Sequence, residues 1–162
     1  MAIELDHLLV PSRDKNGAAR LLGEILGVRW DPCGKDPAAP PSQSARFNVS
    51  DIPDEQWRQY RARRASVYVN DSLTIDFVDP QFLGAEDNGV TAQHYCFRVS
   101  DAVFDAILER INRIGLKYSS AQKLPEPDCK IYKLLGGRGF YFREPDGHSW
   151  EVLTVSYARP AE

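Results

Sequence analysis

Regular alternation of apolar and polar residues marks residues 92–99 as a β-strand with two different faces. One face carries Tyr95, Phe97 and Val99, and the other carries His94, Cys96 and Arg98. This period of two is typical of an extended chain. We expect the apolar face to lie against a helix. The opposite face holds groups that can do chemistry, so we expect it to line a cavity.

The same order of elements occurs twice along the chain. Residues 3–10 form a second alternating strand with a histidine, His7. A helix with an apolar stripe follows each of the two strands, and these helices end at Gly27 and Gly115. The separation between histidine and glycine agrees within one residue in the two copies. Three further strands are expected after each helix, which predicts an α+β fold built from two copies of a βαβββ unit.

The repeat sets the expected domain boundaries. The first module covers residues 1–80, residues 81–91 form a linker, and the second module covers residues 92–157. An insertion at 33–64 makes the first module longer. Its prolines exclude regular structure near 36–42. A short strand at 45–49 and a polar helix at 53–64 are expected within it, and that helix is interpreted as a solvated surface element rather than a lid.

Composition excludes several classes of protein. The chain has 162 residues and a formal net charge of −3, which argues against non-specific nucleic-acid binding. No apolar run approaches the roughly 20 residues of a membrane span, and the N-terminus does not resemble a signal peptide. The three cysteines are widely spaced, which favours free thiols in a reducing cytoplasm over disulfides.

Four side chains are candidate metal ligands. When the last hairpins of the two modules are aligned through their turns, Asp76 matches Glu151. Apolar neighbours flank both carboxylates, so both are expected on the face that holds His7 and His94. Two imidazoles with one or two carboxylates suit Fe(II), Mn(II), Co(II), Ni(II) or Zn(II). A single histidine on a strand more often has a structural role than a metal-binding one. Because aspartate is shorter than glutamate, the sequence is compatible with a site of three ligands without Asp76 or of four ligands with it.

Two further residues are candidates for a role in catalysis. Arg98 shares the face of His94 and could bind an anionic group of a substrate or pair with a carboxylate. Tyr141 could act as an acid, a base or a hydrogen-bond donor near the metal, or belong to the core. His148 is expected to be solvated in a turn, and residues 136–139 are interpreted as a flexible approach to the next strand.

The segment at 139–151, GFYFREPDGHSWE, is similar to the C-terminal signature of the vicinal oxygen chelate superfamily. This superfamily includes glyoxalase I, extradiol dioxygenases, fosfomycin-resistance enzymes and bleomycin-binding proteins. The resemblance implies paired modules forming a half-open barrel around a central cavity, often in a homodimer. His7, His94 and Glu151 match the two-His-one-Glu ligand set of the dioxygenase and fosfomycin groups. Asp76 stands where glyoxalase I has an additional glutamate.

Two functions follow from these observations. The first is a divalent-metal-dependent enzyme of the glyoxalase or dioxygenase type, acting on a small oxygenated organic molecule that chelates the ion. Three protein ligands would suit dioxygenation, and four would suit proton transfer in a lyase or isomerase. The alternative is a metal-free protein that sequesters a drug-like molecule, as bleomycin-resistance proteins do. Those proteins typically lack the ligand set, so its presence here favours the enzyme.

Overall fold

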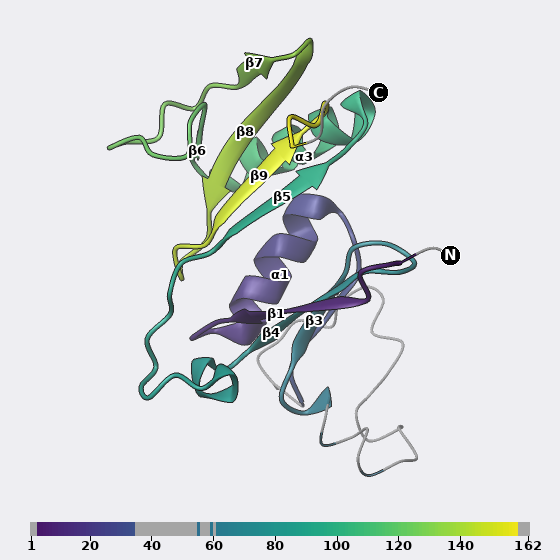
Figure 1. Ribbon diagram of the computed structural model, residues 1–162, viewed down its shortest axis with the longest axis vertical. Helices are drawn as coiled ribbons and strands as arrows, with labels where there is room; N and C mark the ends of the chain where they lie inside the picture. The colour runs from purple at the N-terminus through teal and green to yellow at the C-terminus, as the bar shows by residue number, and fades with distance from the viewer. Residues whose placement is uncertain (1–2, 35–54, 56–58, 60, 159–162) are drawn as a thin grey trace. The chain divides into compact units, whose positions relative to one another are not determined.

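The computed structural model describes residues 3–34, 55, 59 and 61–158 (Figure 1). The chain divides into two compact units, Met1–Val90 and Thr91–Glu162, and each is described by itself. The strand expected at 45–49 and most of the helix expected at 53–64 lie outside the described residues.

The first unit is a four-stranded sheet with one long helix. Its elements are β1 (His7–Pro11), α1 (Lys15–Leu26), β2 (Trp30–Asp31), β3 (Ala65–Tyr68), β4 (Thr74–Val78) and the 3-10 helix η2 (Pro80–Leu83). The strand order is β1-β4-β3-β2, and β1 is parallel to β4 whereas the other pairs are antiparallel. Helix α1 begins where the Asp14 side chain accepts a hydrogen bond from the Gly17 amide, and it ends at Gly27 in the left-handed conformation.

The second unit repeats this arrangement with one more strand. Its elements are β5 (His94–Arg98), α3 (Asp101–Ile114), β6 (Tyr118–Ser119), β7 (Tyr132–Leu134), β8 (Gly137–Arg143) and β9 (Ser149–Leu153). The strand order is β5-β9-β8-β6, with β7 also paired to β8. Strand β5 is parallel to β9, just as β1 is parallel to β4. The α+β class and the two βαβββ units expected from the sequence are thereby confirmed.

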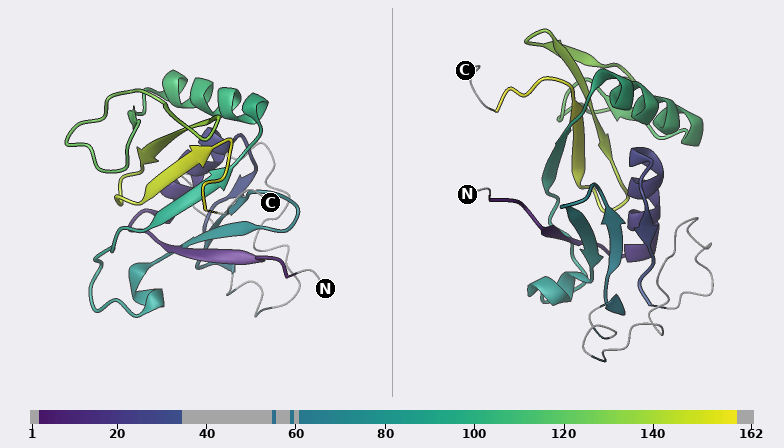
Figure 2. Two further views of the ribbon diagram at one scale, coloured as in Figure 1. Left: turned by 45° about the horizontal axis from the view of Figure 1, so that its top comes forward. Right: turned by 90° about the vertical axis from the view of Figure 1, so that its right-hand side faces the viewer.

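In each unit the helix covers one face of the sheet (Figure 2). Phe104 of α3 packs edge-on against Phe140 of β8, with ring centroids 5.1 Å apart. Trp150 of β9 is fully buried and stacks on Tyr95 and Phe97 of β5. The apolar face of β5 therefore belongs to the core, as its alternation predicted. The helices within the described residues are all too short or too polar to span a lipid bilayer.

Two local predictions were wrong. Residues 137–139 are part of β8 rather than a flexible approach, because β7 pairs with them. His148 is fully buried rather than solvated, because its Nδ1 accepts a hydrogen bond of 3.0 Å from the Gln93 amide. The imidazole thus ties the turn before β9 to the segment that leads into β5.

Candidate metal centre

Glu151 is a fully buried carboxylate in the middle of the second sheet. It lies on β9 between β5 and β8, directly opposite Cys96 on one side and Tyr141 on the other. Its neighbours Trp150 and Val152 are buried in the core. Successive side chains of a strand point to opposite faces, so Glu151 lies on the face away from that core, as predicted.

Neutral donors hold the Glu151 carboxylate. The Tyr132 hydroxyl donates to Oε1 at 2.5 Å, and the Tyr157 hydroxyl donates to Oε2 at 2.8 Å. Burial alone would raise the pKa of Glu151. Hydrogen bonds from Tyr132, Tyr157, Tyr141 and Cys96 outweigh burial, so its pKa lies below the ordinary value. Glu151 is therefore an ionised carboxylate in a buried place.

His94 approaches the same carboxylate. Its Nε2 atom lies 3.2 Å from Oε2 of Glu151, and its side chain is 35% exposed. Two atoms that each lie about 2.1 Å from one ion, at the angles of octahedral or tetrahedral coordination, are roughly 3.0–3.4 Å apart. The observed separation thus fits a pair of metal ligands. The Tyr141 ring stands beside this pair, with its centroid 6.1 Å from that of His94.

Asp76, the counterpart of Glu151 in the first unit, has a different environment. It is buried on β4, where Nη1 of Arg64 lies 3.4 Å from its Oδ2 and the Ser66 hydroxyl donates to its Oδ1. The side chains of Asp76 and Arg64 are 3% and 8% exposed. The Asp76 charge is therefore balanced within the protein by a buried guanidinium group.

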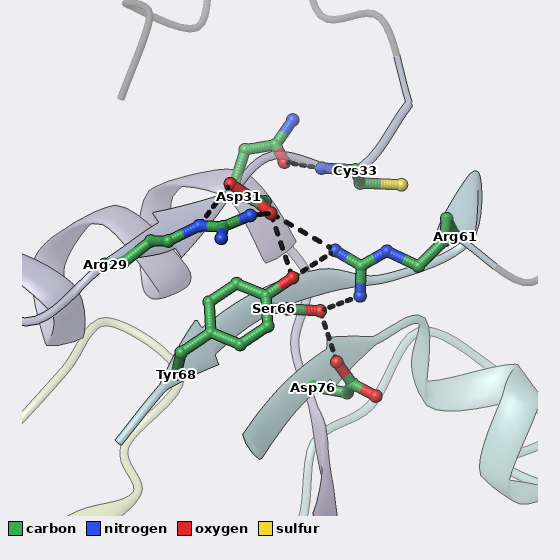
Figure 3. A network of polar contacts seen from close by, with 8 residues as sticks. Arg29, Asp31, Cys33, Arg61, Ser66, Tyr68 and Asp76 are labelled. Carbon is green, nitrogen blue, oxygen red and sulfur yellow. Dashed lines mark hydrogen bonds and ion pairs between the residues drawn. The ribbon is translucent and has the colours of Figure 1, made fainter. Parts of the chain in front are cut away.

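A network of polar side chains continues from Asp76 across the first sheet (Figure 3). Arg61 donates to the Ser66 hydroxyl at 2.7 Å and to the Tyr68 hydroxyl at 2.9 Å. The Tyr68 hydroxyl donates to Asp31, which also pairs with Arg29. Burial, ahead of the Asp31 charge, raises the pKa of Tyr68 to about 12. Arg64, at the basic end of the helix expected at 53–64, is buried and lies beside Asp76. At this residue the expectation of a solvated surface element is wrong.

The remaining candidates are placed as follows. His7 begins β1, is 45% exposed, and its Nδ1 lies 2.7 Å from Asp6, which leaves Nε2 for another partner. Arg98 ends β5 on the face of His94 and is exposed. Within the described ranges, no three His, Cys, Asp or Glu side chains are gathered as a ready-made metal site.

Sequence reasoning missed two residues of this centre, Tyr132 and Tyr157. One signal for Tyr132 was available, because Gly139 interrupts a strand of large residues. A glycine inside a strand often marks the close approach of another group, and Tyr132 lies opposite Gly139. No comparable signal marks Tyr157, which follows β9 in an irregular segment.

The sequence matches no protein-family model and no curated protein. Solved structures do match it. The oxidase ChaP-H1 is 32% identical, with a TM-score of 0.66, and the match covers 98% of this chain and 100% of that one. The oxidase ChaP-H2 is 28% identical, with a TM-score of 0.70, and the match covers 99% of this chain and 100% of that one.

A more distant structure shares the fold. A glyoxalase/dioxygenase from Nostoc punctiforme is 18% identical, with a TM-score of 0.58, and the match covers 94% of this chain and 91% of that one. The repeated βαβββ units, the signature at 139–151 and these matches lead to one conclusion. The chain belongs to the vicinal oxygen chelate superfamily.

Proposed function

We propose that this protein is a divalent-metal-dependent enzyme that oxidises a small organic molecule with two neighbouring oxygen atoms. His7, His94 and Glu151 would hold the ion. One observation carries the proposal. Glu151 is a buried carboxylate that neutral hydroxyl groups support, and an imidazole nitrogen stands 3.2 Å from one of its oxygens.

The buried charge of Glu151 favours a cation as an additional partner. An ionised carboxylate is costly to bury unless it is paired or binds a metal. Hydroxyl groups stabilise the anion by hydrogen bonding but bring no positive charge. A divalent ion beside Oε2 would supply that charge, and the donor set of nitrogen and oxygen atoms suits iron, manganese, cobalt, nickel or zinc.

Three protein ligands fit this chain better than four. Arg64 and Ser66 already occupy the Asp76 carboxylate, so an ion would have to displace a buried ion pair to reach it. A site of three protein ligands would have room for a bidentate substrate and for dioxygen as the oxidant. A bound ion would supply Lewis acidity to the substrate oxygens. The relatives at 28% and 32% identity are named as oxidases, which supports oxidation over isomerisation.

Tyr141 and Arg98 would handle the substrate. Burial and a hydrogen bond to Glu151 raise the pKa of Tyr141, so its phenol stays protonated, and its oxygen would accept a hydrogen bond from a substrate hydroxyl. Arg98 would bind an acidic group of the substrate at the exposed end of β5.

Metal titration tests the proposal. Apo protein would be titrated anaerobically with Fe(II), Mn(II), Ni(II) and Zn(II), and dioxygen uptake would then be followed with catechol-type compounds. We expect one ion per chain in the wild type and in the control Glu109→Gln, an exposed residue of α3, and loss of binding in His94→Ala. If the wild type binds none of these ions, the proposal is wrong, and sequestration of an organic ligand becomes the better hypothesis.

A further inference from the structure

We infer that Tyr132 is a positioning residue that makes Glu151 a one-oxygen ligand and thereby sets which metal ion the protein prefers. The inference rests on the proposed function, because it concerns the ion that His94 and Glu151 would bind. It follows from how β7, β8 and β9 are arranged and from the different partners of the two Glu151 oxygens.

Tyr132 reaches Glu151 by crossing an intervening strand. It stands on β7 opposite Gly139 of β8, and Gly139 in turn stands opposite Leu153 of β9. A Cβ atom at Gly139 would lie 2.2 Å from both Cζ and the hydroxyl oxygen of Tyr132. The phenol therefore lies directly over the glycine. Any other residue at 139 would force the ring away, so the contact is built into the sheet.

The two oxygens of Glu151 have separate tasks. Tyr132 donates to Oε1 at 2.5 Å, whereas Nε2 of His94 and the Tyr157 hydroxyl both approach Oε2. An ion beside His94 would therefore meet Oε2 next to the Tyr157 phenol, while the Tyr132 phenol lies on Oε1. Carboxylates bind metals through one or both oxygens. The Tyr132 hydroxyl disfavours the two-oxygen mode in this site.

The number of oxygens offered affects metal choice. Nitrogen-rich sites with few ligands suit Zn(II), and sites with more carboxylate oxygen suit Mn(II). Removal of the Tyr132 hydroxyl would free Oε1 to join Oε2 on the ion. The affinity for Zn(II) should then fall because the ligand is less well oriented, while the affinity for Mn(II) should be maintained by the added oxygen.

Competition titrations of the apo protein with Zn(II) and Mn(II) test this inference, using wild type, Tyr132→Phe and Tyr118→Phe. Tyr118 is the matched control, because its ring packs on Phe140 in the same sheet. In Tyr132→Phe we expect Zn(II) affinity to fall about tenfold, the size of typical outer-partner effects. The ratio of Mn(II) to Zn(II) affinity should rise about as much, and Tyr118→Phe should leave it within about twofold of wild type.

Two further measurements separate positioning from simple loss of structure. Gly139→Ala should shift the ratio in the same direction, since it displaces the same ring, and Co(II) in Tyr132→Phe should show weaker visible absorption as its coordination number rises. Equal weakening of both ions, or an unchanged ratio, would overturn the inference while leaving the proposed function intact. A wild type that binds neither ion would instead overturn the proposed function.

Discussion

The two copies of the βαβββ unit carry a carboxylate at the same place, but different side chains surround it. Asp76 on β4 and Glu151 on β9 each lie on a strand that is parallel to the first strand of the unit. On that first strand, Leu9 lies opposite Asp76 and Cys96 lies opposite Glu151. Each of these residues comes two positions after the histidine of its own unit. Asp76 is neutralised by the guanidinium group of Arg64, whereas hydroxyl groups support Glu151.

The difference arises from the antiparallel neighbour and from the connecting segments. Ser66 lies opposite Asp76, and Tyr141 holds the matching position opposite Glu151. The segment before β3 brings Arg64 to Asp76, whereas β7 and the segment after β9 bring only phenols to Glu151. One copy of the duplicated unit therefore contains its own counterion. The other keeps an anion whose counterion, in our proposal, is a metal.

The largest expected effect concerns the stability of the metal-free protein. Asp76→Asn should lower the free energy of unfolding by about 3 kcal/mol, because it removes the carboxylate charge that lies beside the buried Arg64 guanidinium group. Glu151→Gln should change it by less than about 1 kcal/mol, because its donors are neutral: the amide oxygen can accept from one phenol, and the other phenol can turn to accept from the amide nitrogen. Urea denaturation followed by circular dichroism measures both. Equal losses in the two variants would contradict the comparison.

A smaller difference is expected at the two matching positions across the strands. Ser66→Ala should cost about 1–2 kcal/mol, because Ser66 accepts from Arg61 and donates to Asp76 in a buried network. Tyr141→Phe should cost less than about 1 kcal/mol, because Tyr132 and Tyr157 still hold Glu151. Thermal unfolding of the two variants would show the order. A greater loss in Tyr141→Phe would mean that Tyr141 is the main support of Glu151.

The smallest effect is a dependence on pH. The folded-state pKa of Glu151 is lowered, so its stabilising contribution is complete above the unfolded value of about 4.3. That contribution disappears as the pH falls through the folded pKa. The stability of wild type relative to Glu151→Gln should therefore be constant from pH 7 to about pH 5 and decline at lower pH. Urea denaturation of both proteins over this pH range measures their difference in free energy of unfolding. If wild type instead became more stable relative to Glu151→Gln as the pH falls, the lowered pKa of Glu151 would be contradicted.

The repeat and one face of the site could be predicted from the sequence. Alternation along 92–99 placed His94 on the face opposite Tyr95 and Phe97, and the structure places Nε2 of His94 beside Glu151. This succeeded because the side-chain period of a strand is fixed at two residues. The structure also places Asp76 and Glu151 at equivalent positions of the two units. In both units the carboxylate lies on the strand that pairs in parallel with the histidine strand, in the same register.

The partners of the two carboxylates could not be predicted. Arg64 comes from a segment that sequence pattern assigned to a solvated surface, and Tyr157 follows the last strand in irregular structure. Neither belongs to a periodic element, so no local pattern places it near a particular carboxylate. Tyr132 depends on β7, a strand that the sequence did not reveal because it has only three residues.

Metal affinity of Glu151→Gln and Asp76→Asn, measured side by side, tests the central claim most directly. Both substitutions remove one negative charge and keep the shape of the side chain. Calorimetric titration of the apo proteins with Co(II) should show at least about a 100-fold loss in Glu151→Gln, since outer partners alone contribute 10–100-fold. Asp76→Asn should bind within about threefold of wild type. An equal loss in both variants, or wild-type affinity in Glu151→Gln, would contradict the account.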